Sequence, residues 1–396
     1  MSVVGRVPVE GGGELAYRLD GSGSSRTGPW LVLSNSLGTD MSMWDPQMVA
    51  LTGHFTVLRY DQRGHGASDA PAGAYSIARM GQDVVALLDH LGVESASFLG
   101  LSLGGMVGIW LAAHHPDRLD RLVLACTAAE LPPASAWEER AAKVRAEGTA
   151  SLSGTLLGRW FTSRFLGERP DVAVAFTAMV SSCSDEGYAS CCEAIAAWQG
   201  RDLLGRIDKP TLVVAGRADP VSTPSTALEL AGDIPGAGLA VLAGASHLAN
   251  VERSEEFTGA VLAHLAGFGY ERGLETRAAV LGRDYVAAAV ARAEAPGAFS
   301  SFQRFITEAA WGGVWSRASL DVRTRRLVTL ALLAGLGRLE EFALHARAAL
   351  QSEGADRLDA EEIGEALIHA AVYAGVPAAN AAFSRLNEVA ASLEHP

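Results

Sequence analysis

The sequence predicts two domains: an α/β domain with a helical cap, followed by an all-α domain. The chain has 396 residues, more than one hydrophobic core usually organises. Short apolar runs alternate with helical patterns up to about residue 265, which is typical of an α/β sheet. Strand patterns then disappear beyond residue 270. We therefore expect an α/β domain over 1–265 and an all-α domain over 270–394.

Six apolar runs in the first region predict strands. They are short, mostly apolar throughout and bounded by Gly, Pro or Asp, as expected of parallel strands buried on both faces of a sheet. Helical patterns lie between them, for example at 78–93. The six runs are WLVLSNS (30–36), FTVLRYD (55–61), ASFLG (96–100), RLVLACT (121–127), TLVVAG (211–216) and LAVLAG (239–244).

The alternation is interrupted once within the first region. From about 131 to 205 the chain is rich in Ala, Glu, Arg and Trp at helical spacing, which predicts a helical cap over the sheet. The segment HLAGFGYERG (264–273) is the predicted linker. Beyond it, helix-periodic stretches are punctuated by glycines and by Pro296 and Pro377.

The charge, the apolar stretches and the cysteine spacing of the sequence argue against several kinds of partner and cofactor. The net charge of −13 disfavours nucleic acid and anionic membranes. The longest apolar stretch, from residue 327, is shorter than the roughly 20 residues of a membrane span, and no signal peptide precedes the first strand. The cysteines lack metal-ligand spacing, and adjacent Cys191 and Cys192 are expected to pack as small apolar residues on a helix. We expect a cytoplasmic protein that needs no metal or other cofactor.

The stretch FLGLSLGGMVG (98–108) places Ser102 between glycines, directly after a predicted strand. A phosphate cradle would need a Lys-Ser/Thr pair or G-x-G-x-x-G spacing, and neither is present. Strand, G-L-S-L-G and helix instead match a nucleophile elbow. Asp219 and His247 each follow a later predicted strand, in the chain order that this fold uses for its triad. In the alternative interpretation, Ser102 is a helix N-cap, Asp219 a turn residue and His247 a loop histidine.

The elbow also predicts the neighbouring groups of the site. The oxyanion hole should use the backbone N–H of Leu103 and that of Leu37, in the loop after the first predicted strand. His65, in YDQRGHGASD (60–69), is expected to stabilise a tight loop beside the site rather than to bind a ligand. Serine rather than aspartate at the elbow favours hydrolysis of an ester or lactone.

Residues 1–265 resemble the 3-oxoadipate enol-lactone hydrolases, a branch of the α/β-hydrolase fold. The resemblance implies Ser102 as nucleophile, His247 as base and Asp219 as the residue that orients it. It rests on the Asp219 and His247 loops and on SNSLGTDMSMWDPQ (34–47), RYDQRGHGASDAP (59–71) and LGLSLGGMVGIWLAAHHPDRLDRLVLACTAA (99–129).

Four cap residues are candidates for shaping the pocket or pairing with a substrate carboxylate. The sequence does not choose among them, because an exposed basic face on a cap helix is a common alternative. They are Trp137, Arg140, Arg145 and Arg164.

In the helical region, EEFALHARAAL (340–350) places Glu341 and His345 on one helix face. Alone, such a pair is either a surface charge pair or an acid/base pair at a pocket. Its surroundings resemble the 4-carboxymuconolactone decarboxylase family over nearly all of 270–394, with one longer and more acidic connection, QSEGADRLDAEE (351–362). The motifs that carry the resemblance are AAWGGVWSR (309–317), RTRRLVTLALL (323–333) and LIHAAVYAGVPAANAAF (367–383).

This second resemblance implies a decarboxylation without a cofactor. Arg325 is the candidate carboxylate clamp, because guanidinium pairs with carboxylate through two hydrogen bonds. His345 is the candidate proton donor, with Glu341 setting its protonation. His369 can equally belong to the core, and Trp311 can equally serve packing or the pocket wall. The region contains no cysteine, which excludes the thiol peroxidase activity of a related branch.

The two resemblances are linked, because the decarboxylation product is the enol-lactone that the first domain would hydrolyse. We therefore predict a bifunctional enzyme of protocatechuate catabolism that acts on small anionic lactones. Two alternatives remain open: a general esterase with a non-catalytic helical oligomerisation domain, and a hydrolase-like receptor that binds a small ligand. The apolar helices beyond residue 270 predict a homo-oligomer formed through that domain.

Overall fold

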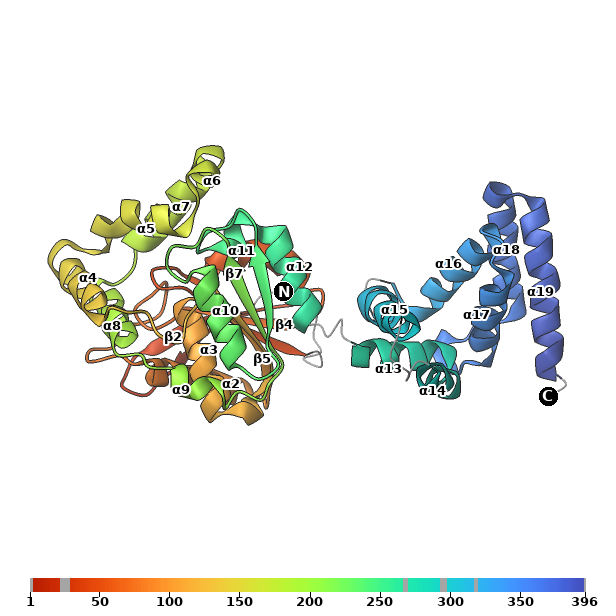
Figure 1. The fold of residues 1–396 in the computed structure, drawn as a ribbon, viewed down its shortest axis with the longest axis horizontal. Coiled ribbons are helices and arrows are strands. Elements are labelled where there is room, and N and C mark those ends of the chain that lie inside the picture. Colours follow the sequence, from red (N-terminus) through yellow and green to blue (C-terminus); the bar gives the residue numbers. More distant parts are fainter. Residues whose placement is uncertain (1–2, 22–28, 266–269, 293–297, 317–319, 395–396) are drawn as a thin grey trace. The chain divides into compact units, whose positions relative to one another are not determined.

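The computed structural model describes residues 3–21, 29–265, 270–292, 298–316 and 320–394. The chain divides into two compact units, Met1–Ala266 and Gly267–Pro396 (Figure 1). Residues 266–269 of the predicted linker and Arg317, the last residue of AAWGGVWSR, lie outside the described residues.

The first unit is built on an eight-stranded sheet with the order β1-β2-β4-β3-β5-β6-β7-β8. Strands β3 to β8 pair in parallel, and β1 and β2 are joined to the β4 edge by antiparallel pairing. The six predicted runs form β3 to β8, while the hairpin β1–β2 was not predicted. The strands are β1 (Val3–Pro8), β2 (Glu14–Asp20), β3 (Trp30–Ser34), β4 (Thr56–Tyr60), β5 (Ala96–Leu101), β6 (Leu119–Ala125), β7 (Thr211–Gly216) and β8 (Gly238–Leu242).

One expectation about these strands is wrong. We expected every run to be buried on both faces, but β8 lies at the edge of the sheet. Its Leu239 and Val241 are 37% and 43% exposed. Strand β5, in the middle of the sheet, is buried at every residue and leads directly to Ser102.

Helices cover this sheet, and α3 is the one that follows Ser102. All its residues from Leu103 to Ala113 are buried, and it packs on β5 and β6, while α12 packs on β6 and β7. The helices outside the cap are η1 (Met41–Trp44), α1 (Asp45–Leu51), α2 (Ile77–Leu91), α3 (Leu103–His114), η2 (Pro116–Arg118), α10 (Pro224–Asp233), α11 (Ala249–Glu252) and α12 (Ser254–Leu265).

The stretch 131–205, between β6 and β7, contains helices only. Helices α4 and α8 pack closely on each other, and α5 packs on α7. In Figure 1 helices α4 to α8 lie to one side of the sheet, coloured from orange-yellow to light green, whereas α9 lies beside α3. The helices of this stretch are α4 (Ala134–Glu147), η3 (Thr149–Leu152), α5 (Ser153–Trp160), α6 (Ser163–Glu168), α7 (Pro170–Ser181), α8 (Asp185–Ala196) and α9 (Arg201–Leu204).

The described part of the second unit is helical throughout (Figure 1). One apolar cluster joins α16 to α19 around Leu330 and Phe342, and another joins the earlier helices around Val280 and Trp311. No helix in the described ranges has the length and hydropathy to cross a membrane. The helices are α13 (Tyr270–Leu281), α14 (Arg283–Ala291), α15 (Ala298–Ile306), the π-helix η4 (Thr307–Trp315), α16 (Val322–Gly335), α17 (Leu339–Gln351), η5 (Gly354–Asp356), α18 (Ala360–Ala374) and α19 (Val376–Glu394).

Candidate active sites

Ser102 occupies a strained turn between β5 and α3. Its backbone has φ 57° and ψ −113°, a conformation that residues with a side chain rarely adopt. Both flanking glycines are required by close approach of backbone: a Cβ atom would lie 2.1 Å from the carbonyl oxygen of Gly104 at Gly100, and 2.2 Å from that of Ser34 at Gly104. The turn therefore presents Ser102 at the carboxyl end of the parallel strands, as a nucleophile elbow does.

The structure brings Ser102, His247 and Asp219 together. His247 Nε2 lies 2.9 Å from Ser102 Oγ, and His247 Nδ1 lies 2.8 Å from Asp219 Oδ2. All three residues are buried, with Ser102 the most accessible at 8%. The geometry is that of a Ser-His-Asp triad, in which the ring can accept the serine proton while the carboxylate fixes its tautomer.

The surroundings of Asp219 favour its ionised form, the carboxylate. Burial would raise its pKa, but His247 and hydrogen bonds from Ser222 and Val221 outweigh burial and lower the pKa below its usual range. Ser222 Oγ donates to Oδ2 at 2.7 Å, and the N–H groups of Val221 and Ser222 donate to Oδ1 at 2.7 and 3.1 Å. The charge is thus held in place for His247.

The predicted oxyanion donors come after two different strands, β3 and β5. Leu103 is the first residue of α3, and Leu37 lies in the loop after β3. In the described part of the chain, neither backbone N–H donates a hydrogen bond, so both are available to a ligand oxygen. Their role as an oxyanion hole stays a prediction.

His65 holds the loop that carries Leu37. Its Nε2 accepts a 2.9 Å hydrogen bond from the N–H of Gly38, while its Nδ1 donates to the carbonyl of Arg63 at 3.1 Å. This pattern requires a neutral ring, and burial lowers the pKa of His65. His65 therefore stabilises the loop beside the active site, in agreement with the expectation from the sequence.

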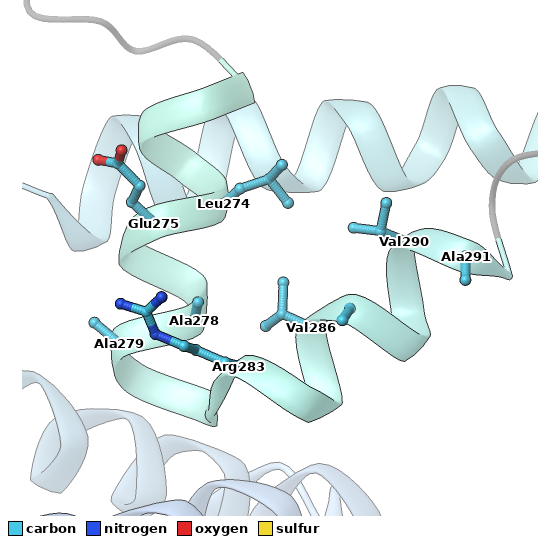
Figure 2. A pocket seen from close by; sticks show the side chains of 9 residues that line it. Leu274, Glu275, Ala278, Ala279, Arg283, Val286, Val290 and Ala291 are labelled. Atoms are coloured by element: carbon cyan, nitrogen blue, oxygen red, sulfur yellow. The ribbon is translucent and has the colours of Figure 1, made fainter.

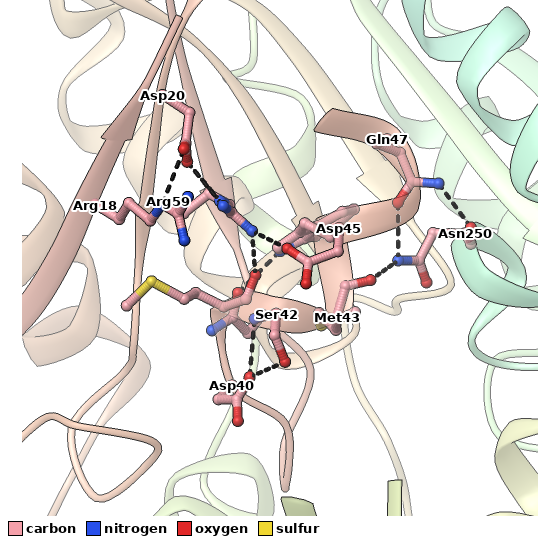
Figure 3. Close-up of polar contacts among 12 residues, drawn as sticks. Arg18, Asp20, Asp40, Ser42, Met43, Asp45, Gln47, Arg59 and Asn250 are labelled. Atoms are coloured by element: carbon pink, nitrogen blue, oxygen red, sulfur yellow. Dashed lines mark hydrogen bonds and ion pairs between the residues drawn. The ribbon is translucent and has the colours of Figure 1, made fainter. Parts of the chain in front are cut away.

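The motif SNSLGTDMSMWDPQ forms a scaffold that joins the oxyanion loop to the segment after His247. Trp44 Nε1 donates to Asn35 Oδ1 at 2.8 Å. Asn250, three residues after His247, donates through Nδ2 to the carbonyl of Met43 at 2.9 Å, and Gln47 Nε2 donates to the Asn250 carbonyl at 2.7 Å (Figure 3).

A buried arginine anchors the other side of this scaffold. Arg59 on β4 donates through Nε and Nη2 to Asp20 Oδ2 at 2.9 and 2.8 Å. Its Nη1 donates to Asp45 Oδ1 at 2.6 Å and to the carbonyl of Met41 (Figure 3). The guanidinium thus connects the sheet to η1 and α1, which follow the loop that contains Leu37.

The cap arginines differ sharply in their partners. Arg145 is held by Glu186 and Glu193, and Arg164 is 86% exposed at its side chain and pairs with Glu168. The Arg145 guanidinium is thus occupied by two carboxylates, and Arg164 lies at the surface with its Nε paired to Glu168.

Arg140 is different, because its guanidinium lies 4.4 Å from the centre of the Trp137 ring and no carboxylate of the described residues forms an ion pair with it. A second cap arginine, Arg159, was missed by the sequence analysis. It also lacks an ion pair among the described residues, and partial desolvation and then the charge of Arg140 lower its pKa. No sequence signal selects it, because its position is known only from the structure, where its neighbour Trp160 has a ring that would lie 3.5 Å from a Cβ atom at Gly38, next to Leu37.

In the second unit, His345 on α17 is stacked with two tryptophans of η4. Its ring lies 6.1 Å from that of Trp311 and 6.0 Å from that of Trp315, at interplanar angles of 11° and 17°. Burial, and then the charge of Arg326, lower the pKa of His345 to about 4. The resting ring is therefore neutral at neutral pH.

Arg326 was also missed by the sequence analysis, which selected its neighbour Arg325. Arg326 is 2% exposed on α16, and its Nη2 donates to the carbonyl of Val280 at 3.0 Å. Its Nε and Nη1 have no hydrogen-bond partner among the described residues. A buried guanidinium with unused donors is a strong signal for an anionic partner, but burial cannot be read from two adjacent arginines in sequence.

The other residues predicted for the site of this unit are mostly more exposed than Arg326 and His345. Glu341 shares α17 with His345 but is exposed, and no ion pair between them is found among the described residues. Arg325 is half-buried on α16. His369 is exposed on α18, with its ring 5.3 Å from that of Tyr373. Trp311 is 6% exposed and belongs to an apolar cluster, so it packs as well as facing His345.

A hollow of about 560 Å³ lies between α13 and α14, close to this cluster (Figure 2). Leu274, Ala278, Val286 and Val290 line it and also pack in the cluster of Trp311. Glu275 and Arg283 are its charged lining residues. The hollow has the size of a small-molecule pocket, but His345 is not part of its lining.

No metal site is formed by the described residues, where no three His, Cys, Asp or Glu side chains are grouped to hold an ion. The four cysteines are buried and free. Cys191 and Cys192 lie fully buried on α8, as predicted for small apolar residues on a helix.

Comparison with known proteins identifies both regions. Residues 29–254 match the α/β-hydrolase fold family, and residues 300–388 match the carboxymuconolactone decarboxylase family. The chain is 44% identical to 3-oxoadipate enol-lactonase 2 of Acinetobacter baylyi, over 61% of this chain and 90% of that protein. It is 41% identical to 4-carboxymuconolactone decarboxylase of the same organism, over 30% of this chain and 85% of that protein. The crystal structure of the enol-lactonase from Burkholderia xenovorans has a TM-score of 0.64 and 45% identity, and covers 66% of this chain and 99% of that one.

Proposed function

The chain belongs to the α/β-hydrolase fold family over residues 29–254 and to the carboxymuconolactone decarboxylase family over residues 300–388, and we propose that it catalyses two consecutive reactions. The second unit decarboxylates 4-carboxymuconolactone to 3-oxoadipate enol-lactone. The first unit then hydrolyses the enol-lactone to 3-oxoadipate, within the catabolism of protocatechuate. The triad geometry is the observation that carries the hydrolytic half, because it supplies an activated serine at a strained elbow.

The hydrolysis follows from the positions of the three side chains. Ser102 Oγ attacks the lactone carbonyl as His247 Nε2 takes its proton, and the N–H groups of Leu37 and Leu103 bind the oxygen that becomes negative. The ring C–O bond then breaks, and His247 returns the proton to the enol oxygen, which stays tethered to the acyl group. Water, deprotonated by His247, releases the acid and restores Ser102.

The cap arginines support an anionic substrate. Arg140 and Arg159 place two positive charges near each other without a carboxylate partner among the described residues. A substrate carboxylate would relieve their repulsion and hold the lactone carbonyl over Ser102. Because the whole chain carries a net charge of −13, such local cations are needed to attract an anion.

The decarboxylation needs a bound anion and a proton carrier. The unused donors of Arg326 are suited to a substrate carboxylate, and the rings of Trp311 and Trp315 lie nearly parallel to that of His345. When CO2 leaves, its bonding electrons delocalise toward the lactone carbonyl, and the resulting dienolate must gain one proton. An anion beside Arg326 would offset the charge that depresses the pKa of His345, so substrate binding itself would help the ring to carry that proton.

Exposed apolar side chains support the proposal that the chain forms a homo-oligomer through its second unit. Val328, Leu332 and Leu336 recur every four residues along α16 and its C-cap, at 48%, 58% and 71% exposure. On α18, which packs on α16, Ile368 and Val372 are also exposed. A second copy of the chain would cover such a face. The cytoplasmic location stays a prediction from the sequence.

The experiment that tests the proposal supplies 4-carboxymuconolactone and follows products over time. The wild-type protein should release CO2, form the enol-lactone transiently and then form 3-oxoadipate. Ser102→Ala should accumulate the enol-lactone, whereas His345→Ala should leave the starting lactone largely unchanged but still hydrolyse added enol-lactone. A general esterase with a non-catalytic second unit would release no CO2, and a receptor would show at most one turnover. Either result would overturn the proposal.

A further inference from the structure

Glu252 is a buried carboxylate that the triad does not use directly. It ends α11, five residues after His247, and is 9% exposed. Its Oε2 accepts a 2.8 Å hydrogen bond from the N–H of Ser246, the residue before His247. Its Oε1 accepts from the N–H of Thr162 at 3.1 Å and also from the Thr162 hydroxyl. Thr162 lies in the cap between α5 and α6, so one carboxylate joins the cap to the loop of the catalytic histidine.

Two more hydrogen bonds connect the same segments. Ser246 Oγ donates to the carbonyl of Arg159 at 2.9 Å. The N–H of Leu248 donates to the carbonyl of Trp160 at 3.0 Å. Both sequence neighbours of His247 are therefore bonded to residues 159 and 160 at the end of α5.

The same end of α5 also touches the oxyanion loop. Trp160 is 3% exposed, and its ring would lie 3.5 Å from a Cβ atom at Gly38. Gly38 follows Leu37, the predicted oxyanion donor. The segment 159–162 thus contacts both the loop that carries the base and the loop that carries an oxyanion donor.

The carboxylate is specifically needed for this connection. No cation of the described residues pairs with Glu252, so its charge is stabilised by hydrogen-bond donors on both oxygens. A glutamine in its place has one oxygen and one NH2 group. Its NH2 group would face either the N–H of Ser246 or the N–H of Thr162, and two donors cannot form a hydrogen bond, whereas the Thr162 hydroxyl can turn to accept. Replacement by glutamine therefore removes one backbone N–H hydrogen bond of the connection while conserving size.

We propose that Glu252 is a positioning residue that couples the cap to the placement of His247. The hydrogen bonds between segment 159–162 and the His247 loop, through Glu252 and Ser246, fix the ring beside Ser102. The inference rests on the proposed hydrolytic function of the first unit, but not on the identity of the lactone.

The test compares Glu252→Gln with Thr162→Val, Thr162→Ser and the control Glu256→Gln. Glu256 is an exposed residue of α12 that pairs with Arg253. Two probes are used: hydrolysis of p-nitrophenyl acetate, a small neutral ester, and the rate at which a fluorophosphonate labels Ser102. The enol-lactone is assayed alongside them.

We expect Glu252→Gln to lower kcat and the labelling rate by about 10- to 100-fold, since a shift of about 1 Å in a reacting group has an effect of this order. The KM for the small ester should change little. Thr162→Val should lower kcat to a smaller extent, Thr162→Ser should restore it, and Glu256→Gln should behave as wild type.

If Glu252→Gln lowers the melting temperature but leaves kcat and the labelling rate at wild-type values, Glu252 is only structural and the inference is overturned. If Glu252→Gln does not fold, the Thr162 variants provide the test: wild-type kcat and labelling rate in Thr162→Val, with a lowered melting temperature, would overturn the inference. A wild-type protein that hydrolyses the ester but not the enol-lactone would contradict the proposed substrate and leave the role of Glu252 to be judged by the two probes.

Discussion

The Nε2 atom of His65 accepts a 2.9 Å hydrogen bond from the N–H of Gly38, and this contact fixes the loop that presents Leu37 to the active site. A protonated ring has no acceptor and would lose the contact. Since burial lowers the pKa of His65 in the folded protein, the unfolded chain takes up the proton first. The stability that the neutral ring contributes is therefore complete above the unfolded pKa of about 6.5 and is lost as pH falls through the folded value.

We predict that His65→Gln reduces this acid sensitivity, because its amide oxygen can accept from Gly38 without titrating. Denaturant unfolding at pH 7.5 and 5.5 should show a loss in the wild type that exceeds the loss in the variant by up to about 1.4 kcal/mol, the most that one titrating group contributes between the unfolded pKa of about 6.5 and pH 5.5. The pH-dependent loss must be compared between the wild type and the variant because another group titrates in the same range: burial raises the pKa of Asp61 to about 6. Its effect has the opposite sign, since stability from a raised carboxyl pKa is lost as pH rises. Equal losses in both proteins would contradict the role of His65.

A second prediction concerns the cap arginines. Arg140→Leu and Arg159→Leu should each raise KM for the anionic enol-lactone by about 10- to 100-fold, the loss expected for a charge-assisted hydrogen bond of about 1.5–3 kcal/mol. The KM for p-nitrophenyl acetate, which has no carboxylate, should stay within a factor of about two. Arg164→Leu is the matched control, because that exposed cap arginine pairs with Glu168. Parallel changes for both substrates would show that these variants disturb the cap rather than an anion site.

Much of the first unit is predictable because its chemistry is local in the sequence. Ser102, Asp219 and His247 follow the parallel strands β5, β7 and β8, and parallel strands bring their carboxyl ends to one edge, so the triad follows from strand order. The hairpin β1–β2 was missed because its strands are antiparallel and partly exposed, without a continuous apolar run. Arg159 and Glu252 could not be selected, because their roles depend on contacts between the cap and the His247 loop, about 90 residues apart in the sequence.

The second unit shows where sequence spacing is insufficient. The i to i+4 spacing correctly places Glu341 and His345 on one helix, but it does not reveal that His345 turns toward Trp311 while Glu341 is exposed. Similarly, nothing in the run RTRRL distinguishes Arg325 from Arg326. Only the packing of α16 against α13 and α17 shows that Arg326 is the buried cation.

A third prediction tests the electrostatic interaction between Arg326 and His345. Arg326→Met should raise the pKa of His345 above its value of about 4, because a nearby positive charge disfavours the protonated ring. The pKa should remain below about 6.5, since burial is the larger cause and persists. NMR titration of the protein labelled at histidine Cε1 measures this shift directly. Arg325→Met is the control and should leave the His345 titration unchanged, so identical curves for all three proteins would exclude the assigned interaction.

The same variant separates binding from proton transfer in the decarboxylation. If Arg326 binds the substrate carboxylate, Arg326→Met should slow CO2 release by at least about 10-fold even though His345 is easier to protonate. Glu341→Gln should have a smaller effect, because Glu341 is exposed and forms no ion pair with His345 among the described residues. Loss of CO2 release in Glu341→Gln but not in Arg326→Met would instead assign the site to the pair predicted from sequence.

The last prediction concerns assembly. Leu332 is 58% exposed at the middle of the apolar row on α16, and a charge there would be buried without a partner if a second copy covers the row. Leu332→Glu should therefore shift the mass measured by light scattering from an oligomer toward a monomer. Val49→Glu is the control, because Val49 is 91% exposed as a single apolar residue on α1 of the first unit and should leave the mass unchanged. The hydrolysis of p-nitrophenyl acetate should survive in both variants, since the triad lies wholly within the first unit. A monomeric wild-type protein would contradict assembly through α16 and α18, because their apolar side chains would then face solvent.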